Sequence, residues 1–270
     1  MAKLAAMFLL VMSVPLNAQN LSNFARVLIP IYAPQRIDGA GGGFEAPLES
    51  YSRVPCSFWP APGRPAPGRT TTGTLQGYET VFIGGASNSK PQSRFLFVDA
   101  GCADDVRFGL TVSSVAASAR QDFRSGVPVV TDPEFFQGEA WLFNIPQEFS
   151  GDKVFSPPTP RYRHKLRVIN AADDNQGEVD VTLWVDTPGP GALFRKDYKV
   201  ALNQRDGADA SFPYYGEVQL ADVCLGISSY ACLQVSGVVQ IVPVTSGLRY
   251  WPLLSSTDNT TQQVFIRVPH

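Results

Sequence analysis

The sequence predicts an all-β protein made of two antiparallel β-sandwich domains in tandem, with one or two short helical turns. Its clearest element is the segment 161–170, RYRHKLRVIN, in which side chains of different polarity alternate residue by residue. A period of two residues is typical of a strand with one buried and one solvated face. The composition agrees, because 23 glycines and 22 prolines divide the chain into short segments suited to strands and turns.

We expect the segment 161–185 to form a β-hairpin, because two alternating runs flank the turn AADDNQG. The residues expected to face the core are Tyr162, His164, Leu166, Val168, Val179, Val181, Leu183 and Val185. The residues expected on the opposite, solvated face of the first run are Arg161, Arg163, Lys165 and Arg167.

Residues 1–18 have the features of an export signal. The positive start Met1-Ala2-Lys3 precedes an apolar run over 4–14, and Ala18 offers a small residue at the cleavage position. The apolar run is shorter than the roughly 20 residues that a membrane-spanning helix needs. We therefore expect an exported chain, periplasmic or extracellular, without a membrane span.

We expect an N-terminal β-rich domain over residues 19–157 and a C-terminal domain over 158–270, because Gly151, Pro157, Pro158 and Pro160 interrupt the chain between them. Strands are predicted in the first domain at 26–32, 44–53, 78–83, 95–99, 107–112, 127–130 and 141–145, with helical turns at 115–123. In the second domain the hairpin precedes strands at 192–202, 214–220, 231–242, 250–256 and 262–268, with a helical turn at 221–225. About seven short strands in a domain of this length are typical of an immunoglobulin-like sandwich.

The segment 53–73 contains the pentapeptide PAPGR twice in tandem. Proline at this density cannot join a strand ladder and favours an extended, solvated loop. One interpretation is a plain surface loop held at its start by Cys56. The other is a docking loop that presents Phe58, Trp59, Arg64 and Arg69.

The chain has four cysteines, and an even number in an exported protein indicates disulfides. Three connectivities are possible, and we favour Cys56–Cys102 with Cys224–Cys232, since each pair then stays within one half of the chain. The alternative, a metal site at the cysteines, is not favoured, because the sequence lacks paired CxxC spacing and nearby histidines. A charged fraction of 17% and a net charge of −2 do not favour nucleic acid as a partner. We expect no cofactor.

Three segments carry a resemblance to a known family: the opening VLIPIY, the stretch 125–146 leading into RYRHKLRVIN, and the ending at 254–269. They resemble, in the same order, an uncharacterised family of exported bacterial proteins. The resemblance implies an immunoglobulin-like β-sandwich fold and export from the cell. It implies no activity and transfers no functional residue, and the PAPGR loop departs from the family's pattern.

Catalytic chemistry has few candidates in this sequence. Nucleophilic hydrolysis needs a base beside its nucleophile, and the two histidines are His164, on the face expected to be buried, and His270 at the C-terminus. The acids cluster in turns, where Asp side chains cap the local backbone. A calcium site is the alternative interpretation for two of these clusters. The first comprises Asp173, Asp174, Asn175 and Glu178, and the second comprises Asp206 and Asp209.

The surface feature that most suggests a binding site is the basic ladder of Arg161, Arg163, Lys165 and Arg167. The expected hairpin partner presents Trp184 between acids on the corresponding face, and this arrangement suits a sugar or an anionic polymer. The other interpretation is a solvated face with Arg–Asp pairs. We expect a non-catalytic structural or interaction module with an unknown protein or polysaccharide partner. The alternatives are a carbohydrate-binding module using the ladder and Trp184, and an extracellular hydrolase.

Overall fold

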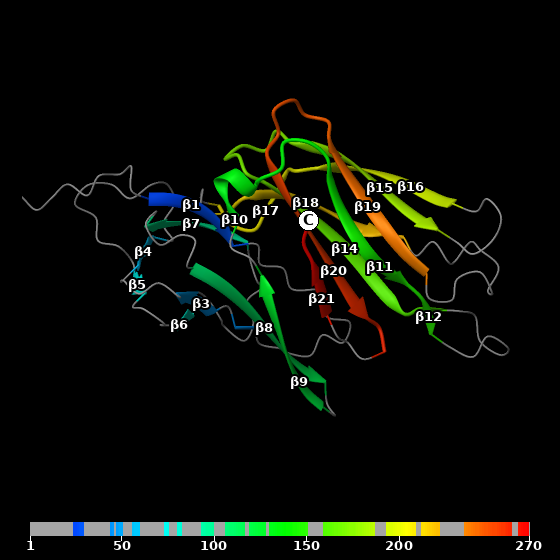
Figure 1. Cartoon of the computed structure of the whole chain (residues 1–270), viewed down its shortest axis with the longest axis horizontal. Coiled ribbons are helices and arrows are strands. Elements are labelled where there is room, and N and C mark those ends of the chain that lie inside the picture. Colours follow the sequence, from blue (N-terminus) through cyan, green and yellow to red (C-terminus); the bar gives the residue numbers. More distant parts are fainter. Residues whose placement is uncertain are drawn as a thin grey trace, which may run out of the picture.

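The structure, a computed structural model, is all-β and antiparallel over the residues that it describes. These residues are 24–29, 44–45, 47–50, 56–59, 73–75, 80–82, 93–99, 106–116, 119–127, 130–150, 159–186, 193–208, 212–221, 235–260 and 264–269. Within these ranges the only helical segment is a single 3-10 turn at Asp132–Glu134. The predicted all-β class is therefore confirmed (Figure 1).

Two sheets dominate the second half of the chain. A four-stranded sheet has the order β11 (Ala140–Gln147), β19 (Val235–Pro243), β15 (Glu178–Asp186), β16 (Leu193–Ala201). A five-stranded sheet has the order β17 (Gln204–Arg205), β18 (Tyr214–Leu220), β14 (Tyr162–Asn170), β20 (Tyr250–Asp258), β21 (Val264–Arg267). The strands predicted at 250–256 and 262–268 are present as β20 and β21, which pair with each other antiparallel.

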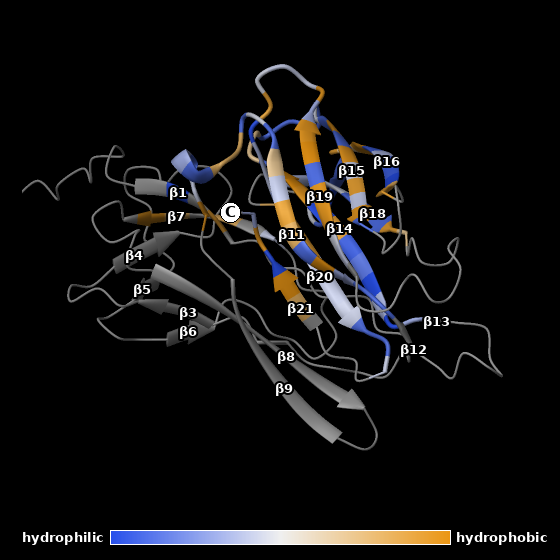
Figure 2. Cartoon of the chain, turned by 45° about the vertical axis from the view of Figure 1, so that its right-hand side comes forward, coloured by the Kyte–Doolittle hydropathy of each residue, from blue (hydrophilic) through white to orange (hydrophobic). Residues whose placement is uncertain are grey.

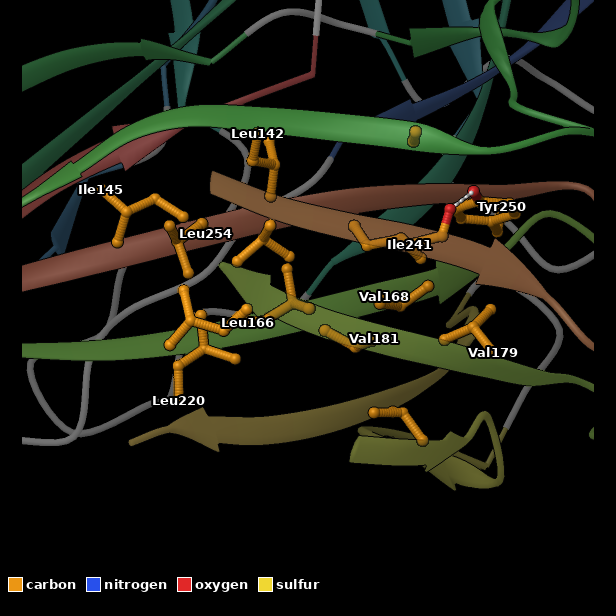
Figure 3. Packing of buried hydrophobic residues seen from close by; sticks show 14 of the residues in the cluster. Leu142, Ile145, Leu166, Val168, Val179, Val181, Leu220, Ile241, Tyr250 and Leu254 are labelled. Carbon is orange, nitrogen blue, oxygen red and sulfur yellow. Dashed lines mark hydrogen bonds between the residues drawn. The ribbon is translucent and has the colours of Figure 1, made fainter. Parts of the chain in front are cut away.

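The two sheets enclose one hydrophobic core (Figure 3). Leu142 and Ile241 enter it from the four-stranded sheet, and Leu166 and Leu254 enter it from the five-stranded sheet. β15 and β19 bury every second side chain, and hydrophobic and hydrophilic bands alternate along β19 in Figure 2. Burying one such aliphatic side chain contributes about 1.5–3 kcal/mol, so the side chains of this core stabilise the packing of the two sheets.

The strands predicted at 161–185 exist, but the prediction that they pair as a hairpin is wrong. β14 pairs with β18 and β20, whereas β15 pairs with β16 and β19. The turn after β14 therefore carries the chain from one sheet to the facing sheet. Alternation specifies which side chains enter the core, and this pattern is the same whether two strands pair side by side or face each other.

Two further sheets lie in the first half of the chain. One has the order β10 (Val130–Thr131), β1 (Phe24–Ile29), β7 (Arg94–Asp99), β4 (Cys56–Trp59), β5 (Gly73–Leu75). The other has the order β2 (Phe44–Glu45), β8 (Val106–Ala116), β3 (Pro47–Ser50), β6 (Thr80–Phe82), and β9 (Ala119–Val127) also pairs with β8.

Helical turns predicted at 115–123 are not found. β8 and β9 pair without a register shift from Phe108–Val127 to Ala116–Ala119, so the segment forms the end of a long hairpin. The helical prediction relied on the alanines of VAASARQDF, and helix propensity is a weak prior that tertiary pairing overrides. The turn predicted at 221–225 lies outside the described residues, apart from Ala221.

The sheet of β10, β1, β7, β4 and β5, which we call the N-terminal sheet, shares a second hydrophobic cluster with the C-terminal five-stranded sheet that contains β14 and β20. Leu28, Phe95 and Val130 pack in it with Ile169 and Trp251. These last two side chains lie on the face of the five-stranded sheet that points away from the main core. β20 is consequently buried on both of its faces along its whole length. In Figure 1 the N-terminal sheet lies to the left of the C-terminal sheets.

The sequence places a domain boundary between residues 157 and 158. β11 precedes this position and pairs with β19, which follows it. β12 (Phe149–Ser150) and β13 (Thr159–Pro160) pair across it. The two facing sheets therefore include residues from Ala140 onward.

Candidate functional site

Three of the four residues of the basic ladder, Arg161, Lys165 and Arg167, form ion pairs with acids of the same molecule. Arg161 forms ion pairs with Glu148, at 2.8 Å, and with Asp258, at 3.0 Å. Lys165 pairs with Glu217 of the neighbouring strand β18. These contacts leave a sheet face of mixed charge in place of the basic face expected from the sequence.

Arg167 is the most buried member of the ladder, with 7% of its side chain exposed. Its guanidinium pairs with Glu217 at 2.6 Å and with Asp206 at 3.1 Å. It also lies over the ring of Tyr215, 3.9 Å from the centroid. A buried cation must be paired, and these contacts give Arg167 a structural role within the five-stranded sheet.

Trp184 does not join the ladder, which corrects the predicted ligand face of Arg161, Arg163, Lys165, Arg167 and Trp184. It lies on β15 in the four-stranded sheet, whereas the ladder lies on β14 in the facing sheet. Trp184 and the ladder would share a face only if β14 and β15 paired as a hairpin, and these two strands do not pair. The Arg195 guanidinium lies over the Trp184 ring, 4.9 Å from its centroid, and Arg195 also pairs with Asp197.

Only part of the predicted docking loop lies within the described residues. Phe58 and Trp59 belong to β4, which pairs with β5 on one side and β7 on the other, so their backbone lies in a sheet and not in a loop. The aromatic segment CSFW ends immediately before the first proline of the repeat, and strand pairing extends up to it. Arg64 and Arg69 lie outside the described residues.

The predicted disulfides and export signal also lie outside the part of the chain that the structure describes. Cys56 begins β4, but Cys102, Cys224 and Cys232 fall in ranges that are not described. The pairings Cys56–Cys102 and Cys224–Cys232 therefore stay predictions, as does the signal at 1–18.

His164 is buried in the core, where both ring nitrogens have partners. Nε2 lies 2.7 Å from the carbonyl oxygen of Pro146, and Nδ1 lies 2.9 Å from Oγ of Ser256. Burial is the main cause that lowers the pKa of His164 to about 4, and the charge of Arg267 lowers it further. The neutral imidazole therefore joins β14 to β11 and β20 inside the core, and it is not exposed on the surface.

Three of the acids predicted as alternative calcium ligands, Asp173, Asp174 and Asp206, have protein partners, and Asp209 lies outside the described residues. Asp173 pairs with Arg26 at 2.9 Å, and Asp174 accepts a hydrogen bond from the amide of Gln176. Asp206 accepts hydrogen bonds from Arg167 and from the hydroxyl of Tyr215. Among the described residues no group of three or more His, Cys, Asp or Glu side chains is arranged to hold a metal ion.

The feature that sequence reasoning missed is the outer face of the four-stranded sheet, which we call the aromatic face. It comprises Trp141, Phe143, Thr182, Trp184, Arg195, Asp197, Val238 and Gln240. The neighbours of these residues along each strand, such as Leu142, Leu183 and Val239, are fully buried, so alternation places the aromatic face outside. Phe143 is 46% exposed. The alternation in AWLF is the signal in the sequence, and by itself it predicts only a strand.

The aromatic rings on β11 form a flat pair. Trp141 and Phe143 stack with ring centroids 6.3 Å apart and an angle of 14° between their planes. The strand register places Trp141 in one row with Gln240, Thr182 and Asp197. The next row contains Val238, Trp184 and Arg195, so two rows of side chains cross the sheet.

Within the described residues no helix is long and apolar enough to cross a membrane. Comparisons of this chain with protein-family models, curated proteins and solved structures find no match.

Proposed function

We propose that this chain is an exported, non-catalytic protein with tandem immunoglobulin-like β-sandwich domains, which acts as a structural or interaction module at or outside the cell envelope. The observation that carries the proposal is the aromatic face. Stacked, partly exposed aromatic rings on a rigid sheet are typical of recognition surfaces, since large rings give contact area at a low cost in conformational entropy.

Two facing sheets with seven principal strands support the immunoglobulin-like assignment. β15 pairs with β16 and β19, and β14 pairs with β18, as the corresponding strands do in that fold. The outer strands are exchanged: the first strand, β11, pairs with β19, and the last long strand, β20, pairs with β14. In the usual arrangement the last strand occupies the place that β11 holds here.

The placement of His164 supports a non-catalytic role. Its imidazole is locked between Pro146 and Ser256 and is almost fully buried, so it has no access to a substrate. The extracellular hydrolase is the competing function. Release of reducing ends or peptides by the purified protein, lost on substitution of an acid, would contradict the proposal.

The proposal is tested by retention of the labelled protein on an insoluble cell-envelope fraction. Phe143→Asp places a charge on the aromatic face and should reduce retention. Phe265→Asp is a matched control, because Phe265 is 43% exposed but lies on β21 in the other sheet. Equal retention of both variants and the unmodified protein would show that the aromatic face is not the contact surface.

A second candidate function is carbohydrate binding. The basic ladder and Trp184 do not assemble into one site, but Trp184 shares a face with Trp141 and Phe143. This arrangement favours a carbohydrate ligand on the four-stranded sheet.

A further inference from the structure

A β-bulge in β11 directs Phe143 outward. Leu142 is opposite Val239 and Ile145 is opposite Gly237, so Phe143 and Asn144 together face the single residue Val238. Asn144 has a φ of 58°, in the left-handed region that Asn tolerates better than most residues. The extra residue returns Ile145 to the core while both Phe143 and Asn144 stay exposed. β11 therefore departs from a regular strand at the point where it presents its exposed ring.

The aromatic face extends across the sheet to Trp184. Phe143 and Trp184 lie on strands separated by β19, and two strand spacings amount to about 10 Å. Val238 fills the position between them in the same row. Among the described residues the indole nitrogen of Trp184 has no hydrogen-bond partner, and Arg195 lies over the ring. Trp141 and Phe143 thus offer the more open ring surface, and Trp184 lies at the far end of the row.

A polar row runs beside the aromatic row. The Thr182 hydroxyl donates to Asp197 at 2.7 Å, and Gln240 donates to Glu139 at 2.9 Å. The Thr182 hydroxyl and then Arg195 lower the pKa of Asp197, so this carboxylate stays ionised at neutral pH. Each of these carboxylate and amide groups retains lone pairs or protons beyond the bonds shown, which hydroxyl groups of a ligand can use.

The charges of this face do not suit an anionic polymer. The described residues on it and at its margin include five carboxylates against two cations. The carboxylates are Glu139, Glu178, Asp180, Asp186 and Asp197, and the cations are Arg195 and Lys199. Both cations are already paired with acids of the same face, at 3.0 Å. A polyanion would meet net negative charge and would have no free cation to bind, whereas an uncharged ligand meets no such barrier.

We propose that the aromatic face binds a neutral polysaccharide chain, whose sugar rings stack on Trp141 and Phe143 and whose hydroxyl groups bond to the row of Gln240, Thr182 and Asp197. This inference deepens the proposed function and rests on it. The two rows of this face cross all four strands of the sheet, which fits a polymer that lies across the strands better than a small ligand enclosed on all sides.

Affinity electrophoresis of the full-length protein in native gels tests this proposal. The gels contain hydroxyethyl cellulose, galactomannan or soluble starch as neutral polymers, and alginate as the anionic polymer. We expect at least one neutral polymer to retard the protein and alginate not to do so. Trp141→Ala and Phe143→Ala should each weaken retardation by about tenfold in apparent Kd, as expected for a buried aromatic contact. Trp184→Ala should have a smaller effect, because Arg195 covers its ring.

Phe265→Ala is the matched control and should bind like the unmodified protein. Circular dichroism checks that each variant folds. If a variant does not fold, Phe143→Ser is tested in its place, because Phe143 is 46% exposed. Retardation by alginate alone, by no polymer, or equally in all variants would overturn the proposal. If Phe143→Asp abolishes envelope retention but no neutral polymer binds, the interaction function stands and the sugar inference fails. The protein could instead dimerise through this face, which sedimentation would detect and Phe143→Asp would abolish. That result would identify a second copy of the chain as the occupant of the face and would also overturn the polysaccharide proposal.

Discussion

The hydrogen bonds of His164 fix the proton on one ring nitrogen. A carbonyl oxygen only accepts, so Nε2 carries the proton that is donated to Pro146. Nδ1 is then the acceptor for the Ser256 hydroxyl, whose oxygen in turn accepts a hydrogen bond from Arg267 at 3.0 Å. Because Pro146 lies on β11 and His164 on β14, this chain joins the two facing sheets through the core. Protonation of Nδ1 would place a second donor against the Ser256 hydroxyl.

The stability of the protein should therefore depend on the protonation of His164. Its folded-state pKa of about 4 lies below the ordinary value of 6.5, so the neutral form stabilises the fold fully above pH 6.5. This contribution is lost as the pH falls from 6.5 through 4, and the total loss is roughly 3 kcal/mol. Urea unfolding over this pH range measures it, with His164→Phe as the non-titrating reference. Parallel pH profiles for the two proteins would contradict the prediction.

Arg167 should be essential to stability, although it belongs to a ladder predicted to be solvated. Arg167→Ala leaves Glu217 and Asp206 without their buried partner and should cost about 3–5 kcal/mol in unfolding free energy. Arg167→Lys should recover part of this loss, since lysine keeps the charge but not the two-sided hydrogen bonding or the stacking on Tyr215. Chemical denaturation measures both variants. Lys199→Ala, which removes a solvent-exposed pair with Asp180, is the control and should change stability little.

Arg167 also shows where prediction from sequence ends at the residue scale. Alternation correctly placed Leu166 and Val168 on the core side and Arg167 on the other side of β14. It did not predict that Glu217 of β18, Asp206 and the ring of Tyr215 would enclose Arg167 on that second side. Burial on the outer face depends on elements far away in the sequence, and a local pattern contains no information about them.

At the scale of elements, β18 depends on a glycine where it approaches β16. A Cβ atom on Gly216 would lie 2.5 Å from the carbonyl oxygen of Ala201 and 2.5 Å from Cγ1 of Val200. Real Cβ contacts are not this short, and the neighbour is backbone that cannot move by itself. β16 and β18 belong to the two different sheets, so this glycine permits their close approach at one edge of the core.

Gly216→Ala should destabilise the fold by about 1–3 kcal/mol, because the strands must separate to admit the methyl group. The chain offers a matched control in Gly138→Ala, since a Cβ atom at Gly138 would have no atom within 4 Å. Thermal unfolding followed by circular dichroism compares the two variants. A similar melting temperature for both would show that β16 moves away from β18 at little cost.

The sequence predicts where many strands lie, but it does not predict which strands pair with each other. The strands at 141–145, 214–220 and 250–256 were predicted from composition and alternation, and all three exist. The partners of β14 and β15 were predicted wrongly, because a short turn favours a hairpin but also allows the chain to cross between sheets. The aromatic face could not be predicted without the correct strand partners, since Trp141 on β11 and Trp184 on β15 share a sheet only because both strands pair with β19.

At the scale of the whole molecule, the N-terminal sheet and the five-stranded sheet are joined by apolar and charged contacts. The Arg26 guanidinium lies 3.6 Å from the centroid of the Phe95 ring and pairs with Asp173 beyond β14. Leu28 is fully buried in the cluster that also holds Ile169 and Trp251. Separation of these parts would expose the outer face of β20 to water, so we expect them to unfold together.

Leu28→Ala in the full-length chain tests this coupling. The cavity should cost about 2–5 kcal/mol. If the parts unfold as one unit, the free energy of opening measured by hydrogen exchange should fall equally at amides of β7, beside Leu28, and of β15, in the remote sheet. Val181→Ala is the reciprocal variant and should lower protection in β7 as well. A loss confined to β7 in the first variant and to β15 in the second would mean that the cluster around Trp251 joins two independent folding units.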